Sequence, residues 1–255
     1  KNLRKEFKTK HKEPGFLGSL KSIIHPKTKS LTAVDNISFN VNEGEIIAFI
    51  GPNGAGKSTT IKILTGILHP TSGNAKVLGL IPWKDRIKLA YKIGSVFGQK
   101  PQLWYHLPAI DTFNLFSKIY ELDKKEYEER LDYLVKTFDI KDLLNTPVRK
   151  LSLGQRMRCE IAASLLHKPK IIFLDEPTIG LDIVAKQKMR ELIKKLNKKE
   201  KTTIFLTSHD TQDIEHLCKR IIIVNHGRII YDGSVNKLSK KFLKNKVISV
   251  QFETP

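Results

Sequence analysis

The chain has 255 residues, of which 40% are hydrophobic and 28% are charged, and its formal net charge is +19 at pH 7. This length allows one large domain or two small ones, and it is sufficient to bury a substantial core. The composition excludes a disordered chain, and no run approaches the ~20 consecutive apolar residues that span a bilayer. The first residues, KNLRKEFKTK, lack the apolar core of a secretory signal. We therefore expect a soluble globular protein.

The positive charge is concentrated at the amino end of the chain. Residues 1–30 carry nine Lys/Arg against two Glu, whereas residues 100–150 carry nine side chains of each sign. A basic surface attracts nucleic acid or anionic lipid headgroups, and a general solubilising charge is the equally weighted alternative. Cys159 and Cys218 have neither metal-ligand nor disulfide spacing, which favours a reducing compartment such as the cytosol.

In chain order, residues 31–50 predict two strands separated by a turn at 42–44, and residues 57–68 predict a helix. Helical spacing continues over 108–144 and returns at 154–167 and 182–197. Two apolar runs, 170–174 and 202–206, are short enough to be buried parallel strands. Residues 220–233 predict a hairpin that turns at 225–227. The pattern is typical of an α/β domain with a mainly helical insertion in its middle.

A glycine-rich segment between the second predicted strand and the first predicted helix matches G-x-x-x-x-G-K-[ST]. Glycines let backbone N–H groups turn around phosphate oxygens, and the helix amino end adds its positive dipole. Lys57 would neutralise β/γ-phosphates, and the Ser58 hydroxyl would coordinate Mg²⁺. A chance match or an inert nucleotide site is the alternative. The predicted triphosphate-binding residues are Gly51, Pro52, Asn53, Gly54, Ala55, Gly56, Lys57, Ser58 and Thr59.

Two carboxylates, Asp175 and Glu176, follow the apolar run that is expected to form a buried strand. The carboxyl ends of such strands present ligands in α/β sheets. Asp175 can reach the Mg²⁺ shell, and Glu176 lies one residue further on, suited to polarising an attacking water. Without the phosphate loop, a plain acidic strand end would be the better interpretation.

A third segment, LSLGQ at 151–155, opens a predicted helix and places Ser152 and Gly154 where they can contact phosphate. An ordinary serine N-cap is the alternative reading of this segment alone. Taken in order, the phosphate loop, Gln99, LSLGQ, IIFLDEP, the pair at 181–182 and TSH at 207–209 resemble the nucleotide-binding subunit of an ABC transporter. The resemblance runs from residue 31 to about residue 232.

The resemblance implies a P-loop NTPase core with a mixed sheet, an antiparallel N-terminal β subdomain and an inserted helical subdomain. The expected boundaries are 1–98 and 168–235 for the core with its β subdomain, 99–167 for the helical subdomain, 11–30 for an atypical insertion and 236–255 for a basic C-terminal extension. It also implies catalytic roles for three residues. Glu176 would be the general base, His209 would contact the γ-phosphate, and Gln99 would sense Mg²⁺ and the attacking water.

The resemblance further implies that two such domains face each other. Asp182 would lie at the contact between protomers, and the signature residues would act on ATP held by the other subunit. These signature residues are Ser152, Leu153, Gly154 and Gln155. Leu153 departs from the common LSGGQ signature, but Ser152 and Gly154 are kept, so we expect the phosphate contacts to survive.

Two N-terminal features also depart from the common pattern. The best match to the aromatic residue that stacks on adenine is Phe7, 44 residues before Gly51, and a core role for Phe7 is its alternative. The extra segment 11–30 places Phe16, Leu17, Leu20, Ile23 and Ile24 on one helical face. We expect a basic amphipathic element that touches the membrane partner or lipid headgroups, or else a local cover of its own domain.

The segment 99–106 joins the core to the helical subdomain, and the resemblance implies that it accepts a transmembrane permease subunit. Trp104 and Tyr105 suit such an interface, although a role in the subdomain's own core is the alternative. We expect an ATPase that uses ATP and Mg²⁺, most similar to the ABC type-two exporter branch. It would be peripheral at the cytoplasmic face of the membrane, as a homodimer or paired with a related ATPase. The rivals are a non-transport ABC ATPase acting on nucleic acid or ribosomes, and a regulatory module without hydrolysis; nucleic acid is not the expected partner.

Overall fold

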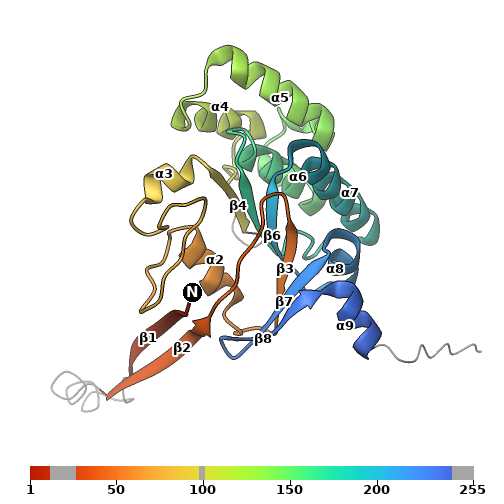
Figure 1. Ribbon diagram of the computed structural model, residues 1–255. Coiled ribbons are helices and arrows are strands. Elements are labelled where there is room, and N and C mark those ends of the chain that lie inside the picture. Colours follow the sequence, from red (N-terminus) through yellow and green to blue (C-terminus); the bar gives the residue numbers. More distant parts are fainter. Residues whose placement is uncertain (12–26, 98–100, 243–255) are drawn as a thin grey trace, which may run out of the picture.

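The computed structural model describes residues 1–11, 27–97 and 101–242. A six-stranded sheet forms its centre, in the order β4-β5-β6-β3-β7-β8, and a separate antiparallel pair, β1 and β2, extends from it as an arm (Figure 1). Strands β3 to β7 are parallel, and β8 returns antiparallel to β7. The strands are β1 (Leu3–His11), β2 (Lys27–Ile37), β3 (Ile46–Ile50), β4 (Ile93–Phe97), β5 (Ile171–Asp175), β6 (Thr203–Thr207), β7 (Arg220–Asn225) and β8 (Arg228–Ser234).

Helices lie on both faces of this sheet (Figure 1). The α-helices are α2 (Lys57–Leu64), α3 (Arg86–Ala90), α4 (Ala109–Ile119), α5 (Lys124–Phe138), α6 (Leu153–Ser164), α7 (Ile183–Glu200), α8 (Thr211–Leu217) and α9 (Val235–Phe242). Short 3₁₀ turns lie at Lys141–Leu143 and Val148–Lys150. None of the described helices combines the length and the apolar character needed to cross a bilayer. The mixed sheet, its antiparallel pair and the surrounding helices confirm the predicted fold class.

The central strands are apolar on both sides because both faces of the sheet are covered. All five residues of β6 are buried. Its alternate side chains enter two separate cores, Ile204 and Leu206 one and Phe205 the other. The Phe205 and Phe49 rings lie 5.2 Å apart between centroids in the second core. This double burial fixes the register, so that the carboxyl ends of β3, β5 and β6 meet at one edge.

Several boundaries differ from the sequence-based expectation. The first helix ends at Leu64 rather than residue 68, because Gly66 takes a left-handed conformation with φ of 76° directly after the C-cap. The helical stretch 108–144 is two helices, separated where Asp123 caps α5 with its side chain. Strand β4 was not predicted. Gly94 interrupts its apolar run, and a Cβ there would lie 2.6 Å from the Ser164 carbonyl oxygen.

The inserted segments are described in part. Helices α4, α5 and α6 fall within the predicted helical subdomain, whose boundaries stay a prediction. The ends of the predicted 11–30 element are strands, since His11 pairs with Lys27 in the register of β1 and β2. The apolar residues at 16–24 lie outside the described residues, so the expected amphipathic element stays a prediction. The predicted C-terminal extension begins as α9, and residues 243–255 also lie outside.

Candidate nucleotide-binding site

The glycine-rich loop runs from the end of β3 into α2 and is confined by two neighbouring segments. A Cβ on Gly51 would lie 2.1 Å from the Val224 carbonyl oxygen of β7. A Cβ on Gly56, whose φ is 100°, would lie 2.2 Å from the Ala33 carbonyl oxygen of β2. Only glycine fits such close backbone approaches. The loop is therefore wedged between β2 and β7, while its tip at 52–54 is exposed.

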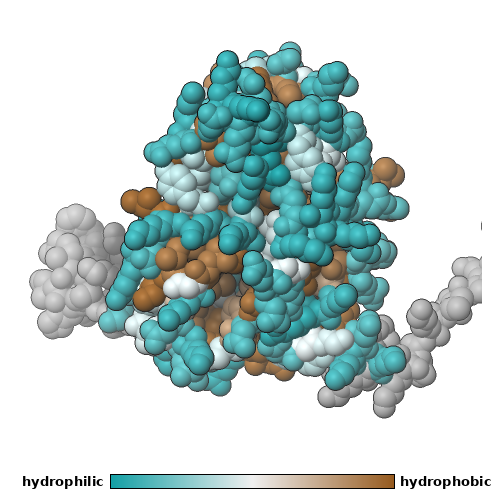
Figure 2. All heavy atoms as spheres, turned by 45° about the horizontal axis from the view of Figure 1, so that its top comes forward, coloured by the Kyte–Doolittle hydropathy of each residue, from teal (hydrophilic) through white to brown (hydrophobic). Residues whose placement is uncertain are grey.

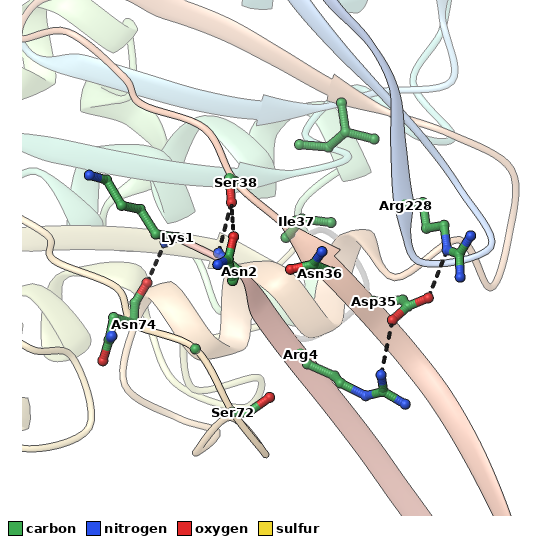
Figure 3. A pocket seen from close by; sticks show the side chains of 12 residues that line it. Lys1, Asn2, Arg4, Asp35, Asn36, Ile37, Ser38, Ser72, Asn74 and Arg228 are labelled. Carbon is green, nitrogen blue, oxygen red and sulfur yellow. Dashed lines mark hydrogen bonds and ion pairs between the residues drawn. The ribbon is translucent and has the colours of Figure 1, made fainter.

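The turn between β7 and β8 is hydrogen-bonded to this loop. The Gly227 amide donates to the Ala55 carbonyl at 3.1 Å, and the Asp35 amide donates to the Gly227 carbonyl at 2.8 Å. Asp35 also holds Arg228 at 2.7 Å and Arg4 at 3.4 Å, across a hollow of about 1100 Å³ (Figure 3). These ion pairs join the β1–β2 arm to the β7–β8 turn, and that turn contacts the phosphate loop. Because the charges in the hollow pair with one another, we assign it a structural role.

Lys57 is almost fully buried beneath the loop, with 6% of its surface exposed. Its Nζ donates to the carbonyl oxygens of Gly51 at 2.7 Å and Pro52 at 3.3 Å, and lies 3.3 Å from Nε2 of His209. Burial lowers the pKa of Lys57, and the nearby carboxylates of Glu176 and Asp175 act in the opposite direction. The ammonium is thus held at the loop by neutral acceptors, which an anionic phosphate would outcompete.

Ser58 and Asp175 meet where α2 begins and β5 ends. The Ser58 hydroxyl donates to Oδ2 of Asp175 at 3.0 Å, and the Thr207 hydroxyl donates to Oδ1 at 2.6 Å. Hydroxyl and carboxylate oxygens are the donors that Mg²⁺ prefers, and Mg²⁺ keeps waters and substrate phosphate oxygens as further ligands. Within the described ranges no group of three His, Cys, Asp or Glu could hold a metal. The donor set thus fits a metal completed by a triphosphate.

Glu176 and His209 come together beside this pair, although 33 positions separate them in the sequence. Nε2 of His209 lies 2.8 Å from Oε1 of Glu176. Glu176 has a left-handed φ of 57°, unusual for a residue with a side chain, and Thr207 fixes its amide through both hydroxyl and carbonyl oxygens. Backbone strain of this kind is concentrated at functional sites. The structure thus joins the predicted base and the predicted γ-phosphate contact.

The signature segment forms a separate, largely self-contained unit at the start of α6. Ser152 accepts from the Gln155 amide at 3.2 Å, and Gln155 accepts from the Ser152 amide at 2.8 Å, a complete capping box. Leu153 packs against Gly180, where a Cβ would meet Cδ2 of Leu153 at 2.9 Å. In the described part of the chain, no hydrogen bond joins residues 152–155 to residues 51–58. Their predicted action on ATP stays a prediction.

Three further predicted residues are Asp182, Phe7 and Gln99. Asp182 is exposed and caps α7 by accepting from the Ala185 amide at 2.8 Å. Phe7 is half-buried on β1, with Nζ of Lys5 5.2 Å from its ring centroid. Gln99 lies outside the described residues. No contact tests the adenine role of Phe7 or the protomer contact of Asp182.

Sequence reasoning assigned no role to two polar groups that organise the site, although Thr207 is part of the TSH motif. Thr207 joins Asp175 to Glu176, as described above. Asp213 is fully buried and accepts from Thr178, from Ser208 at 2.7 Å and from Arg190 at 2.6 Å. It thereby connects the turn after Glu176 to the residue before His209. For Thr207 the only signal was its place in the TSH motif, and for Asp213 there was none, because both act through contacts between distant segments.

A glycine loop with a buried lysine, a serine–aspartate pair and a glutamate–histidine pair at one sheet edge define a P-loop nucleoside triphosphatase. The family model described as "ABC transporter" matches residues 34–179. The chain is 34% identical over 212 residues to the ABC transporter ATP-binding protein NatA of Bacillus subtilis, covering 83% of this chain and 86% of that protein. It is 38% identical over 209 residues to the lantibiotic transport ATP-binding protein SrtF of Streptococcus pyogenes, covering 80% and 87%.

Among solved structures, the chain is similar to a dimeric post-hydrolysis state of the ATP-binding cassette MJ0796 bound to ADP and Pi. The TM-score is 0.75 at 27% identity, with 92% of this chain and 97% of that chain covered. The protein belongs to the ABC transporter family, as an ATP-hydrolysing subunit. This confirms the transporter resemblance over the nucleic-acid and non-hydrolysing alternatives.

Proposed function

We propose that this chain is the ATPase of an exporter and that it docks from the cytoplasmic face onto a separate transmembrane permease subunit. The observation that carries the proposal is an apolar platform, defined here as residues 102–107. Trp104, Tyr105 and Leu107 are 47%, 51% and 40% exposed within it. Such exposure argues against a role in the subdomain's own core, and aromatic residues are enriched at interface cores. The name of SrtF, a lantibiotic transport protein, supports transport of a cargo.

Backbone hydrogen bonds join the platform to a neighbouring segment. The Val148 amide donates to the Leu107 carbonyl at 3.0 Å, and the Arg149 amide donates to the Tyr105 carbonyl at 2.9 Å. These bonds fix its backbone to the segment just before Ser152. The face drawn in Figure 2 shows separate apolar patches within a mostly hydrophilic surface. Exposed apolar patches mark contacts with a protein or a membrane.

Hydrolysis would take place between two copies of the domain, either a homodimer or a pair with a related ATPase. Lys57 would neutralise the phosphates, Glu176 would take a proton from the attacking water, and His209 would orient Glu176 and contact the γ-phosphate. Ser58 and Asp175 would hold Mg²⁺, which supplies charge neutralisation when bound. Ser152 and Gly154 of the second copy would complete the phosphate contacts, and Asp182 would lie at the boundary between the two copies.

The test is affinity purification of the Glu176→Gln protein, with ATP, from detergent-solubilised native membranes. We expect a stoichiometric polytopic membrane protein to copurify. The double variant Trp104→Ala/Tyr105→Ala, in the same background, should lose that protein and still bind ATP. Copurification of RNA or DNA without any membrane protein would contradict the proposal. Equal recovery of the membrane protein with both variants would contradict the placement of the docking surface.

A further inference from the structure

Helix α6 carries a second functional candidate, Glu160, eight residues after Ser152. Its side chain is buried, with 3% of the residue exposed. The Gln102 amide donates to Oε1 at 3.1 Å and to Oε2 at 3.0 Å, and the Leu103 amide donates to Oε1 at 3.3 Å. No ion pair within 4 Å reaches Glu160 in the part of the chain that the structure describes. A buried carboxylate is costly unless it is hydrogen-bonded, so these amides account for its presence.

The electrostatics of Glu160 show how completely it is withdrawn from water. Burial raises its pKa, and the two backbone amides and the Arg156 charge offset this effect only in part. An apolar residue at this position would leave the Gln102 and Leu103 amides without this acceptor, which is unfavourable for buried donors. The two oxygens of Glu160 accept hydrogen bonds from the first two backbone amides of the platform, those of Gln102 and Leu103.

The segment that Glu160 binds is also anchored from two other elements. The Gln102 side-chain amide donates to the Ser95 carbonyl of β4. The Trp104 amide donates to the Thr112 hydroxyl of α4 at 3.2 Å. Residues 102–104 therefore contact β4 through the Gln102 side chain, and α4 and α6 through their backbone amides. Of these three elements, only α6 begins at the signature residues.

We propose that Glu160 is a positioning residue that connects the amino end of α6 to the platform. The helix spans about 12 Å between Ser152 and Glu160. A displacement of its amino end would therefore move Glu160 with it. When ATP draws Ser152 toward a second copy, the carboxylate pulls on the backbone of 102–103 and so shifts Trp104. This inference rests on the proposed function, because it concerns the surface to which a permease subunit would dock.

The chain offers a direct reporter, since its two tryptophans are Trp83 and Trp104. The reference protein carries Trp83→Phe and Glu176→Gln, so that Trp104 alone emits and ATP is retained. We expect ATP to change the Trp104 emission of this protein. Adding Glu160→Gln replaces one acceptor oxygen by a donor that faces the Gln102 amide, and should reduce the ATP-induced change by roughly fivefold or more. The nucleotide affinity of the Glu160→Gln protein should stay within about twofold of the reference. The exposed Glu191→Gln should change neither the nucleotide affinity nor the ATP-induced change in Trp104 emission.

Backbone amide exchange supplies the second readout. In Glu160→Ala, exchange at Gln102 and Leu103 should accelerate roughly 10- to 100-fold while the central sheet keeps its protection. Acceleration throughout the chain would show a general folding role and overturn the proposal. An unaltered ATP response of Trp104 in Glu160→Gln would also overturn it. A reference protein that binds no ATP would overturn the proposed function, and the coupling with it, whatever the exchange at 102–103.

Discussion

The phosphate loop and the amino end of α6 are both predicted to contact ATP, but the chain prepares them differently. At the loop, Lys57, Asp175 and Glu176 are each engaged by groups from other segments, up to 152 positions away in the sequence. At α6, the Ser152 side chain is exposed, and among the described residues its hydroxyl accepts only from the Gln155 amide, three residues on. The first region is preorganised by the tertiary fold, and the second is an independent local cap.

This difference indicates where the site is complete and where it needs a partner. Preorganised charges in a partly buried site act on phosphate without further reorganisation. A capped helix end with an exposed serine keeps its amino-terminal dipole available to an anion that arrives from outside. The difference supports the proposal that one chain supplies a charged half-site and, apart from it, the helix end for the half-site of a second copy. The similar cassette MJ0796 is dimeric in its post-hydrolysis state.

The largest expected effect is on ATP turnover, and it tests the phosphate-loop region, whose charges the tertiary fold preorganises. Glu176→Gln removes the carboxylate that would accept a proton from water, and should lower ATP turnover by roughly 10²- to 10⁴-fold. ATP binding should persist, because Lys57 and the loop are unchanged. Phosphate release and equilibrium nucleotide binding measure the two quantities, with Glu191→Gln as the exposed control. Near-normal turnover would remove Glu176 from the role of base.

A smaller effect concerns the junction that joins the helical insertion to the core. His167 stacks on Tyr120 at 3.9 Å, donates from Nε2 to the Ile93 carbonyl at 2.9 Å, and has no partner for its buried Nδ1 within the described residues. Burial lowers the pKa of His167 to about 4. The unfolded chain therefore binds more protons between the ordinary histidine pKa and pH 4, so stability falls as the pH drops through this window.

The His167→Gln variant should lose about 3 kcal/mol less stability than the wild type between pH 7 and pH 4. Glutamine keeps a donor for the Ile93 carbonyl and does not titrate. Urea unfolding at the two pH values measures the difference, and the exposed His226→Gln serves as control. Equal acid sensitivity of wild type and His167→Gln would show that this histidine is not buried as described.

The smallest expected change separates the two roles of Ser152. Ser152→Ala should cost about 1 kcal/mol of stability, because the N-cap is lost, whereas Ser152→Asp keeps a good cap. If Ser152 also faces phosphate, the aspartate variant should retain the stability of the wild type and still lose roughly 10- to 100-fold in ATPase rate. Thermal unfolding measures the change in stability, and steady-state ATPase assays measure the change in rate. Wild-type turnover in Ser152→Asp would leave only the capping role.

The sequence predicted those parts of the site that consecutive residues define. The phosphate loop, the strand ending in Asp175 and Glu176, and the hairpin at 220–233 were found because spacing and local chemistry specify each of them. The roles of Thr207, Asp213 and Glu160 were missed, and so was strand β4. Their roles depend on pairings such as that of Glu160 with the Gln102 amide, which are 58 positions apart. A linear pattern does not encode which distant backbone a polar side chain will meet.

The most direct test of the account mixes two inactive variants, Lys57→Ala and Ser152→Asp. Each homodimer carries the same defect in both sites and should hydrolyse little ATP. In a mixed dimer, one site would receive the intact loop of one chain and the intact serine of the other. The mixture should then recover about a quarter of the wild-type rate, since random pairing makes half of the dimers mixed with one intact site each. A mixture no more active than its components would contradict a site shared between two copies of this chain.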